Sequence, residues 1–278
     1  MSADWPFQSA KAPVGVIWPA EAIWEAVVPL LPGFTVEILP EIDSTNSELM
    51  RRARAGQRDA TLLVAERQTA GRGRLGRDWH SDTQGLGTTL TFSLGLPLNP
   101  LDWSGLSLAV GLSVAQSLHP KVQIKWPNDL WLFDRKLAGI LIETATWEGE
   151  RYAVIGIGIN IVAGSATGLR TAPAGLHELL AGVQAPDVLA QVVPPLVREV
   201  VQFSGAGFAP LAPAFSTRDV LQGREVVCTD GTTGWARGVD ATGALMVQTA
   251  AGMQAISSAE VSVRPTGTGA TTLNTPCA

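Results

Sequence analysis

The sequence concentrates groups that could bind an anion in one stretch, Arg67 to His80, which has the sequence RQTAGRGRLGRDWH. Its glycines, Gly71, Gly73 and Gly76, fit the spacing G-x-G-x-x-G of dinucleotide-binding loops. We reject that interpretation, because no apolar helical repeat follows and the residue about 20 positions further on is Leu96 rather than an acid. A flexible loop that presents guanidinium groups to a carboxylate or phosphate fits better. A solvated basic turn is the other open interpretation.

A second candidate site is the start of a predicted helix. Thr45 and Glu48 have the T-x-x-E spacing of a capping box, which predicts a helix from Thr45 to about Ala55. The residues could do no more than cap the helix, and the spacing alone favours that interpretation. The alternative is that the same N-terminus, with its free N–H groups, faces a polar ligand.

A third candidate is the strand at residues 155–161. Its isoleucines share one face, while Gly156, Gly158 and Asn160 share the other. Glycine weakens a strand and often marks close approach by a ligand or another backbone. Tight packing against a helix would explain the glycines but not the asparagine. We therefore interpret this face as the floor of a ligand site.

The composition bounds the class of protein. With 278 residues, 46% of them hydrophobic and 16% charged, the chain can bury a large core and hold more than one domain. A net charge of −5 argues against a general nucleic-acid binder. Two cysteines and three scattered histidines predict neither a disulfide framework nor a zinc motif. Because no signal peptide or membrane-length apolar run is visible, we expect a cytoplasmic protein without a membrane partner.

Alternating and apolar patterns predict the elements that would position these groups. We expect strands at residues 36–39, 61–65, 88–94, 122–126, 130–133, 136–146 and 152–161, and helices at 21–28, 45–55, 104–118, 177–180 and 187–204. The strand at 88–94 should be half-buried, and Pro194-Pro195 should break or start a helix. Pro210 and Pro213 mark a linker, and five short strands after residue 220 predict a small all-β barrel. Lys125, on a predicted strand, could reach a phosphate or be an exposed lysine.

Five motifs in series carry a resemblance to a known family. They are Ser44-Thr45-Asn46; Gln68 with Gly71-Arg72-Gly73-Arg74-Leu75-Gly76-Arg77 and Trp79; Lys125-Trp126-Pro127-Asn128-Asp129; Arg135-Lys136-Leu137-Ala138-Gly139-Ile140; and Gly156-Ile157-Gly158-Ile159-Asn160. In order and spacing they resemble the biotin–protein ligase family over about residues 39–265. Each motif is weak evidence alone, whereas five in series are specific. The resemblance implies an α+β fold, with a mixed sheet and helices like those of class II aminoacyl-tRNA synthetases and a small Src-homology-3-like barrel at the C-terminus.

The resemblance also implies how the chain is divided. Residues 1–38 would be an N-terminal extension, 39–217 the biotin- and ATP-binding catalytic domain, 218–265 the small β-barrel, and 266–278 a disordered tail. Some members of the family carry an N-terminal winged-helix repressor domain. This sequence resembles the ligase-only class, so we expect no DNA partner, and a homodimer stays open.

The implied reaction has two steps. Biotin and ATP, with Mg²⁺, would form biotinyl-5′-adenylate and pyrophosphate, and a lysine of a biotin carboxyl carrier protein, such as that of acetyl-CoA carboxylase, would then attack the mixed anhydride. The residues agree with this chemistry. A carboxylate that meets a triphosphate accumulates negative charge, which placed cations stabilise. No side-chain nucleophile is needed because the partner supplies the lysine, and the sequence offers no nucleophile–base constellation.

The resemblance assigns roles to individual residues. The catalytic cations would be Lys136, Arg74 and Arg72. Biotin would be bound by Ser44, Thr45, Asn46, Gln68, Gly71, Arg72, Gly73, Lys136 and Gly139. The nucleotide would be bound by Arg74, Arg77, Trp79, Asn128, Asp129 and Asn160, and Asp129 is the candidate Mg²⁺ contact.

Two positions depart from the family pattern. Leu75 stands where a further loop arginine often occurs, and the segment from Ser81 to Gly85 lacks a proline often seen there. Two alternatives from other classes also stay open. A lipoate–protein ligase would share the fold and the adenylate chemistry, although the Gly-Arg-Gly-Arg loop favours biotin. A biotin sensor without catalysis would use the same pocket only for binding.

Overall fold

The computed structural model describes residues 16–79, 85, 87–164, 173–257 and 263–265. The expected disordered tail at 266–278, the first fifteen residues of the N-terminal extension and most of the segment that departs from the family pattern lie outside this part of the chain.

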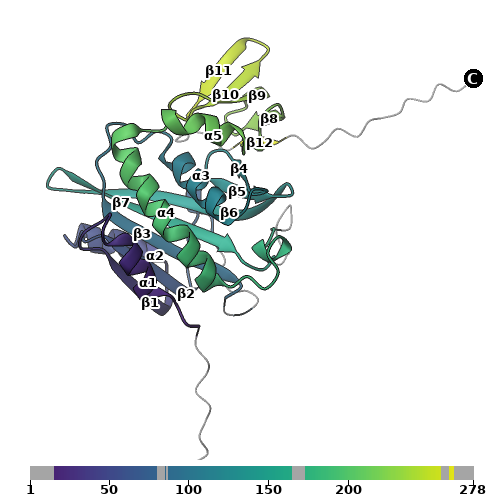
Figure 1. The fold of residues 1–278 in the computed structure, drawn as a ribbon. Coiled ribbons are helices and arrows are strands. Elements are labelled where there is room, and N and C mark those ends of the chain that lie inside the picture. The colour runs from purple at the N-terminus through teal and green to yellow at the C-terminus, as the bar shows by residue number, and fades with distance from the viewer. Residues whose placement is uncertain (1–15, 80–84, 86, 165–172, 258–262, 266–278) are drawn as a thin grey trace, which may run out of the picture.

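A seven-stranded mixed sheet forms the centre of the molecule, in the order β1-β2-β3-β7-β6-β5-β4 (Figure 1). Its strands are β1 (Thr35–Ile42), β2 (Thr61–Gln68), β3 (Thr89–Pro97), β4 (Gln123–Lys125), β5 (Asp129–Leu132), β6 (Arg135–Trp147) and β7 (Glu150–Asn160). Only β1 and β2 pair in parallel, and the other neighbours are antiparallel. The predicted α+β class with a mixed sheet is confirmed.

Helices cover both faces of this sheet. The long helix α4 (Ala185–Ala206), with α3 (Leu106–Leu118) and α1 (Ala20–Val27), packs on one face, where the isoleucines of β7 lie in the main hydrophobic core. The helix α2 (Thr45–Arg54) packs on the other face over a smaller cluster that includes Leu49, Leu63 and Val154. The period-2 alternation of β7 therefore divides its side chains between the two cores.

Strand β3 corrects the expectation of a half-buried strand. Thr91 and Ser93 are 2% and 0% exposed, as buried as Phe92 between them. The polar face of β3 is covered because α2 lies over it. The hydroxyls are satisfied by hydrogen bonds, with Thr91 Oγ1 donating to the Ala65 carbonyl at 3.0 Å.

Helix α4 corrects the expected interruption at Pro194-Pro195. It runs without a break from Ala185 to Ala206, with both prolines inside. Proline removes a backbone hydrogen bond, but Val192, Val193, Leu196 and Val197 along this segment are fully buried. Tertiary packing therefore outweighs the local preference. The predicted helix at 177–180 is a single 3-10 turn, η2 (Leu176–Glu178).

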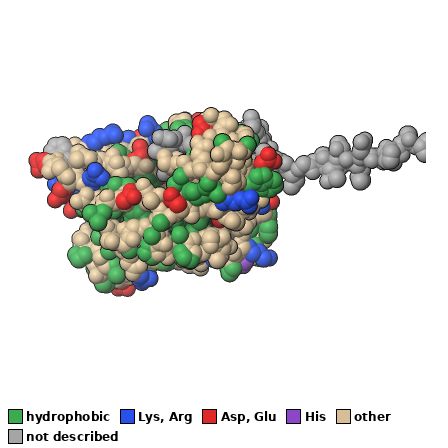
Figure 2. All heavy atoms as spheres, turned by 90° about the horizontal axis from the view of Figure 1, so that it is seen from above, with side chains coloured by type: hydrophobic (Ala, Val, Ile, Leu, Met, Phe, Trp, Pro, Cys, Tyr) green, Lys and Arg blue, Asp and Glu red, His purple; other side chains and the backbone are tan. Residues whose placement is uncertain are grey.

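The predicted linker around Pro210 is also helical, as η3 (Ala209–Leu211) and α5 (Ala212–Ser216). After it, β8 (Glu225–Cys228), β9 (Thr233–Val239), β10 (Leu245–Thr249), β11 (Gly252–Ile256) and β12 (Val263–Pro265) form an antiparallel sheet in the order β11-β10-β9-β8-β12. The five predicted C-terminal strands are confirmed. Figure 2 shows that acidic and basic side chains are interspersed on the face seen from above.

The two sheets meet along a tight seam. The Ile124 amide donates to the Arg218 carbonyl at 2.8 Å, and the Val220 amide donates to the Ile124 carbonyl at 3.0 Å. Trp126 Nε1, fully buried, donates to the Gly243 carbonyl at 3.0 Å. The main hydrophobic core is continuous across this seam, because it contains side chains of both sheets.

Asp219 lies in the seam and makes the stability of the protein depend on pH. Burial raises the pKa of Asp219 to about 6. The pKa of this carboxyl is higher in the folded than in the unfolded protein, so the folded state favours its protonated form. The stability that this form contributes is fully present below about pH 4 and is lost as pH rises through about 6. We expect Asp219→Asn to have a free energy of unfolding roughly 1–3 kcal/mol higher than that of wild type at pH 7. At pH 4 most of this difference should disappear.

Urea unfolding at pH 4, 5, 6 and 7 measures this effect. Asp230→Asn, at an exposed position in the turn between β8 and β9, is the matched control and should leave the wild-type pH profile intact. If the Asp219→Asn and wild-type profiles are parallel, burial of this carboxyl does not influence stability.

Candidate active site

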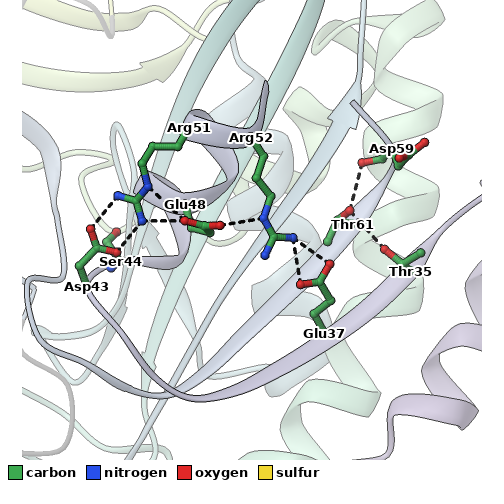
Figure 3. Close-up of polar contacts among 9 residues, drawn as sticks. All are labelled: Thr35, Glu37, Asp43, Ser44, Glu48, Arg51, Arg52, Asp59 and Thr61. Atoms are coloured by element: carbon green, nitrogen blue, oxygen red, sulfur yellow. Dashed lines mark hydrogen bonds and ion pairs between the residues drawn. The ribbon is translucent and has the colours of Figure 1, made fainter. Parts of the chain in front are cut away.

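The N-terminus of α2 is fixed by a group of hydrogen bonds and ion pairs (Figure 3). Ser44 is the N-cap residue, and its side chain accepts from the Ser47 amide at 3.3 Å. The predicted capping box at Thr45 and Glu48 was therefore wrong by one residue. Glu48 instead accepts from Arg51 and Arg52, at 2.7 and 2.8 Å. The Thr45 amide is not a free N–H group either, because it donates to Gln68 Oε1 at 2.8 Å.

The same helix start is tied to the loop before it. Arg51 donates to both carboxylate oxygens of Asp43, at 2.7 and 3.0 Å. This hydrogen bond from Arg51 holds the pKa of Asp43 at about 2, well below its ordinary value. Arg52 reaches Glu37 on β1 in the same way. The helix is thus anchored to the first strand as well as to its own cap.

A cavity opens on this face of the sheet beside the α2 N-terminus. Its lining brings together most of the predicted site residues: Ser44, Thr45, Asn46, Gln68, Arg72, Gly73, Arg74, Trp79, Asn128, Lys136, Gly139, Gly156 and Gly158, together with Thr91, Phe92, Ile140, Leu141 and Ile157. These residues come from α2, β2, β3, β6, β7, the turn between β4 and β5, and the loop of residues 71–79, here called the arginine loop, so the five motifs converge on one place.

One end of the cavity is lined by buried neutral hydrogen-bonding groups. Thr45 Oγ1 lies 3.1 Å from Gln68 Oε1 and 2.7 Å from Ser93 Oγ. Ser93 Oγ donates to Asn46 Oδ1 at 2.7 Å, and Asn46 Nδ2 donates to Glu143 Oε2 at 2.9 Å. The result is a chain of hydrogen bonds that runs from β2 across α2 and β3 to β6.

The other end is cationic. Lys136 Nζ forms an ion pair with Asp129 Oδ1 at 2.8 Å. Arg74 Nη1 donates to Asn128 Oδ1 at 3.2 Å, and Asn128 Nδ2 donates to the Ile140 carbonyl at 2.8 Å. Burial lowers the pKa of Arg74, and the nearby Asp129 acts in the opposite direction. A guanidinium desolvated in this way binds an anion more strongly than an exposed one.

The arginine loop folds into a closed hairpin rather than a helix start. The Trp79 amide donates to the Gly71 carbonyl at 2.9 Å and the Gly73 amide to the Arg77 carbonyl at 2.7 Å. A β-carbon at Gly71 would lie 2.4 Å from the Trp79 carbonyl oxygen, so this closure requires glycine. At its tip is the 3-10 turn η1 (Arg74–Gly76), which confirms that the G-x-G-x-x-G spacing does not open a helix.

The glycine face of β7 lines the cavity, but two side chains cover it. Asn46 lies over Gly156, where an added β-carbon would be 2.2 Å from Asn46 Oδ1. The Trp79 ring lies over Gly158, where a β-carbon would be 2.3 Å from ring carbons. The predicted open ligand floor is therefore partly occupied by walls of the cavity itself. Trp79 Nε1 is buried and has no hydrogen-bond partner within the described part of the chain.

Several predicted residues lie beside the cavity rather than in its lining. Arg77 has an exposed side chain, and Asn160 Nδ2 donates to the Lys136 carbonyl at 3.5 Å. Asp129 takes part through its ion pair with Lys136. Lys125 is not in the lining, and its Nζ lies 4.6 Å from the centre of the Trp131 ring.

Comparisons with known proteins match this arrangement. The model of the biotin/lipoate A/B protein ligase family matches residues 39–160, and that of the biotin protein ligase C-terminal domain matches residues 223–264. The biotin–[acetyl-CoA-carboxylase] ligase of Paracoccus denitrificans is 32% identical over 237 residues, which is 81% of this chain and 98% of that protein. This chain belongs to the biotin protein ligase family.

Other family members are similar to the same extent. The bifunctional ligase/repressor BirA of Escherichia coli (strain K12) is 35% identical over 78% of this chain and 70% of its own length. The biotin protein ligase from Aquifex aeolicus, solved in complex with biotin and ATP, has a TM-score of 0.69 at 30% identity and covers 83% of this chain and 99% of its own. The ligase fold predicted from the motifs is thus confirmed.

The site residues predicted from the motifs of this ligase family did not include the five further lining residues given above, nor two residues that lie behind the lining, Ser93 and Glu143. Ser93 could have been found, since Thr89, Thr91 and Ser93 form an uninterrupted polar face on β3. Glu143 gave no signal, because a single acid in a long strand is usually solvent-exposed.

A second cavity, of about 400 Å³, lies next to the first. It is lined by residues of α3 and the loop before it, of β6 and β7, and of the turn between β9 and β10, including Trp103, Leu106, Ile142 and Gly243. Arg74 and Ile140 line both cavities.

Proposed function

We propose that this protein activates biotin with ATP to form biotinyl-5′-AMP and then transfers biotin to a lysine of a carrier protein. The observation that carries the proposal is one cavity with buried neutral hydrogen-bonding groups at one end and Lys136, Arg72 and Arg74 at the other. A polar ring such as the ureido group of biotin suits the first end. A carboxylate that meets phosphate suits the second.

In the first step a carboxylate oxygen of biotin attacks the α-phosphorus of ATP. The bond from that phosphorus to the bridging oxygen breaks, and pyrophosphate leaves. Negative charge accumulates on the α-phosphoryl oxygens, so cations placed there stabilise the transition state. We assign this role to Lys136 and Arg74, with Arg72 closing over the acyl phosphate, while Gly71, Gly73 and Gly139 allow close approach.

In the second step the neutral amine of the carrier lysine attacks the acyl carbon of the adenylate. The C–O bond to AMP breaks, and the amine loses a proton as the amide forms. No nucleophile of this chain is required, and none of the named residues supplies one. The carrier is the biotin carboxyl carrier protein of a carboxylase such as acetyl-CoA carboxylase.

The nucleotide end is assigned to Trp79, Asn128, Asp129, Arg77 and Asn160. The buried Trp79 Nε1, which has no partner among the described residues, supports this assignment, since such a group is costly unless a ligand satisfies it. Mg²⁺ would be held chiefly by the phosphates of ATP, as is usual for nucleotide sites, with Asp129 as the protein carboxylate. No cluster of three or more acidic, histidine or cysteine ligands occurs within the described residues, which fits a metal that enters with the nucleotide.

We also propose the chain divisions given by the motifs, with catalysis in 39–217 and the small sheet in 218–265. A homodimer fits the proposal, and no DNA partner is required for it. We propose the cytoplasm as the location of the protein, because the reaction consumes ATP, which is abundant there. None of the described helices is long and apolar enough to span a membrane.

ATP–pyrophosphate exchange tests the proposed function, with biotin, lipoate and octanoate as the acids. We expect exchange with biotin alone and, after addition of a carrier domain, a covalent biotin label on its lysine. Exchange with lipoate but not biotin would keep the adenylation chemistry and change the substrate. Biotin binding without exchange would make the protein a sensor rather than an enzyme.

A further inference from the structure

We propose that Glu143 is a positioning residue that, through Asn46 and Ser93, holds the Thr45 hydroxyl as a hydrogen-bond acceptor toward the cavity. This polarity would select an acid that presents an N–H group, such as the cyclic urea of biotin. The inference rests on the proposed function, and it adds the residue that fixes the direction of the hydrogen bonds at the neutral end of the cavity.

The chain of hydrogen bonds has a fixed direction at its β6 end. Asn46 Nδ2 lies 2.9 Å from Glu143 Oε2 and 3.3 Å from the Leu141 carbonyl oxygen. A carboxylate and a backbone carbonyl can only accept hydrogen bonds. The amide nitrogen of Asn46 must therefore face β6, and its oxygen must face β3.

That direction passes to the two hydroxyls. Asn46 Oδ1 accepts only, so the single hydroxyl hydrogen of Ser93 points to it across 2.7 Å. Ser93 Oγ is also 2.7 Å from Thr45 Oγ1. Since Ser93 has no second hydrogen, Thr45 must be the donor in that contact.

Thr45 then has no hydrogen left for the cavity. Gln68 Oε1 is a second acceptor for the Thr45 hydroxyl, at 3.1 Å, and it also receives the Thr45 backbone N–H at 2.8 Å. The single hydroxyl hydrogen of Thr45 is therefore taken up by Ser93 or by Gln68. Thr45 Oγ1 can therefore only accept from a ligand in the cavity that it lines. Thr45, Asn46 and Ser93 are 3%, 3% and 0% exposed, so water does not relax this order.

A fixed acceptor discriminates between ligands. A buried site that is built to pair with an N–H rejects an analogue without it strongly, because the acceptor is left unpaired. If the chain of hydrogen bonds is broken, the Thr45 hydroxyl is held only by its longer, 3.1 Å contact with Gln68, so it can rotate and donate to the cavity. The site should then tolerate an oxygen where biotin has N–H.

The probes are biotin and the two cyclic carbamates in which oxygen replaces one ureido N–H. The measurement is kcat/KM for exchange in wild type, Ser93→Ala, Glu143→Met and Glu143→Gln. We expect wild type to prefer biotin over one carbamate by about 100-fold, and Ser93→Ala to reduce that ratio about tenfold by raising the KM for biotin. The KM for ATP should stay unchanged.

Glu143→Met should reduce the ratio less than Ser93→Ala, because the Leu141 carbonyl still orients Asn46. Glu143→Gln should keep the wild-type ratio of kcat/KM for biotin to that for the carbamate, since the new amide oxygen accepts from Asn46. Glu148→Gln, the same change at an exposed carboxylate in the following turn, is the control.

Two results would overturn the inference. If Ser93→Ala and Glu143→Met lower kcat/KM for biotin and carbamate by the same factor, the residues are merely structural. If Glu143→Gln behaves like Glu143→Met, the acceptor at this position is irrelevant. Failure of the wild type to activate biotin would overturn the proposed function itself. That outcome differs from the two above, in which the wild type still activates biotin.

Discussion

Lys136→Ala is expected to lower the rate of biotin-dependent ATP–pyrophosphate exchange by about 1,000-fold, the size of effect seen when a placed group that stabilises transition-state charge is removed. Lys136 Nζ lies at the cationic end of the cavity, 2.8 Å from Asp129 and 5.8 Å from the centre of the Trp79 ring. Its side chain is 43% exposed, so the substitution should leave the melting temperature almost unchanged.

Lys125→Ala is the matched control for this prediction. Lys125 is a strand lysine that packs on the Trp131 ring outside the cavity lining, so its loss should alter exchange by less than about threefold. Lys136→Arg should recover only part of the activity, because the planar guanidinium does not place its charge where an ammonium does. Wild-type exchange in Lys136→Ala would remove Lys136 from the mechanism.

Gly158→Ala is expected to reduce kcat/KM at least about 100-fold, since a displacement of about 1 Å at a site can cost that much. The added β-carbon would lie 2.3 Å from two carbons of the Trp79 ring, so the ring must move. With Trp79 at the nucleotide end, the KM for ATP should rise more than the KM for biotin. Steady-state kinetics with each substrate varied in turn measures the difference.

Gly156→Ala provides the contrast. Its β-carbon would lie 2.2 Å from Asn46 Oδ1, at the neutral end, so here the KM for biotin should rise more. Gly205→Ala, with no atom within 4 Å of the added carbon, should change neither the KM for ATP nor the KM for biotin. In a double-mutant cycle, Gly158→Ala should lower kcat/KM little further once Trp79 is alanine, because the ring that the β-carbon would meet is gone. Additive losses of kcat/KM would show that contact with the Trp79 ring is not the cause.

Much of the fold follows from local patterns. The alternation of β7 and the all-round apolar character of α3 determine which faces are buried, and the structure agrees with both. The prolines of α4 and the N-cap of α2 could not be predicted in this way. In α4, buried valines on both sides of the proline pair decide the outcome. At α2, Ser44 and Thr45 are both common N-cap residues, and the T-x-x-E spacing favoured Thr45, but Ser44 is the cap and the Thr45 amide donates to Gln68 instead.

Residues of the candidate site could be predicted where they belong to a motif. Contacts between residues far apart in the sequence, and residues that reach the cavity only through another side chain, could not. The motifs located the arginine loop, Lys136 and the β7 glycines. They did not indicate that Trp79 would cover Gly158, because that contact joins residues far apart in the sequence. Glu143 reaches the cavity only through Asn46, so neither its type nor its position in β6 marks it.

The seam between the two sheets has a consequence for unfolding. Its hydrogen bonds join β4 to the segment before β8, Trp126 donates to a carbonyl of the C-terminal sheet, and a single hydrophobic core includes both. Loss of the small sheet would expose part of that core and leave the indole of Trp126 without its acceptor. Heat or denaturant should therefore melt both sheets in one cooperative transition. We therefore expect that the parts of the chain before and after residue 217, although they differ in architecture, do not unfold independently.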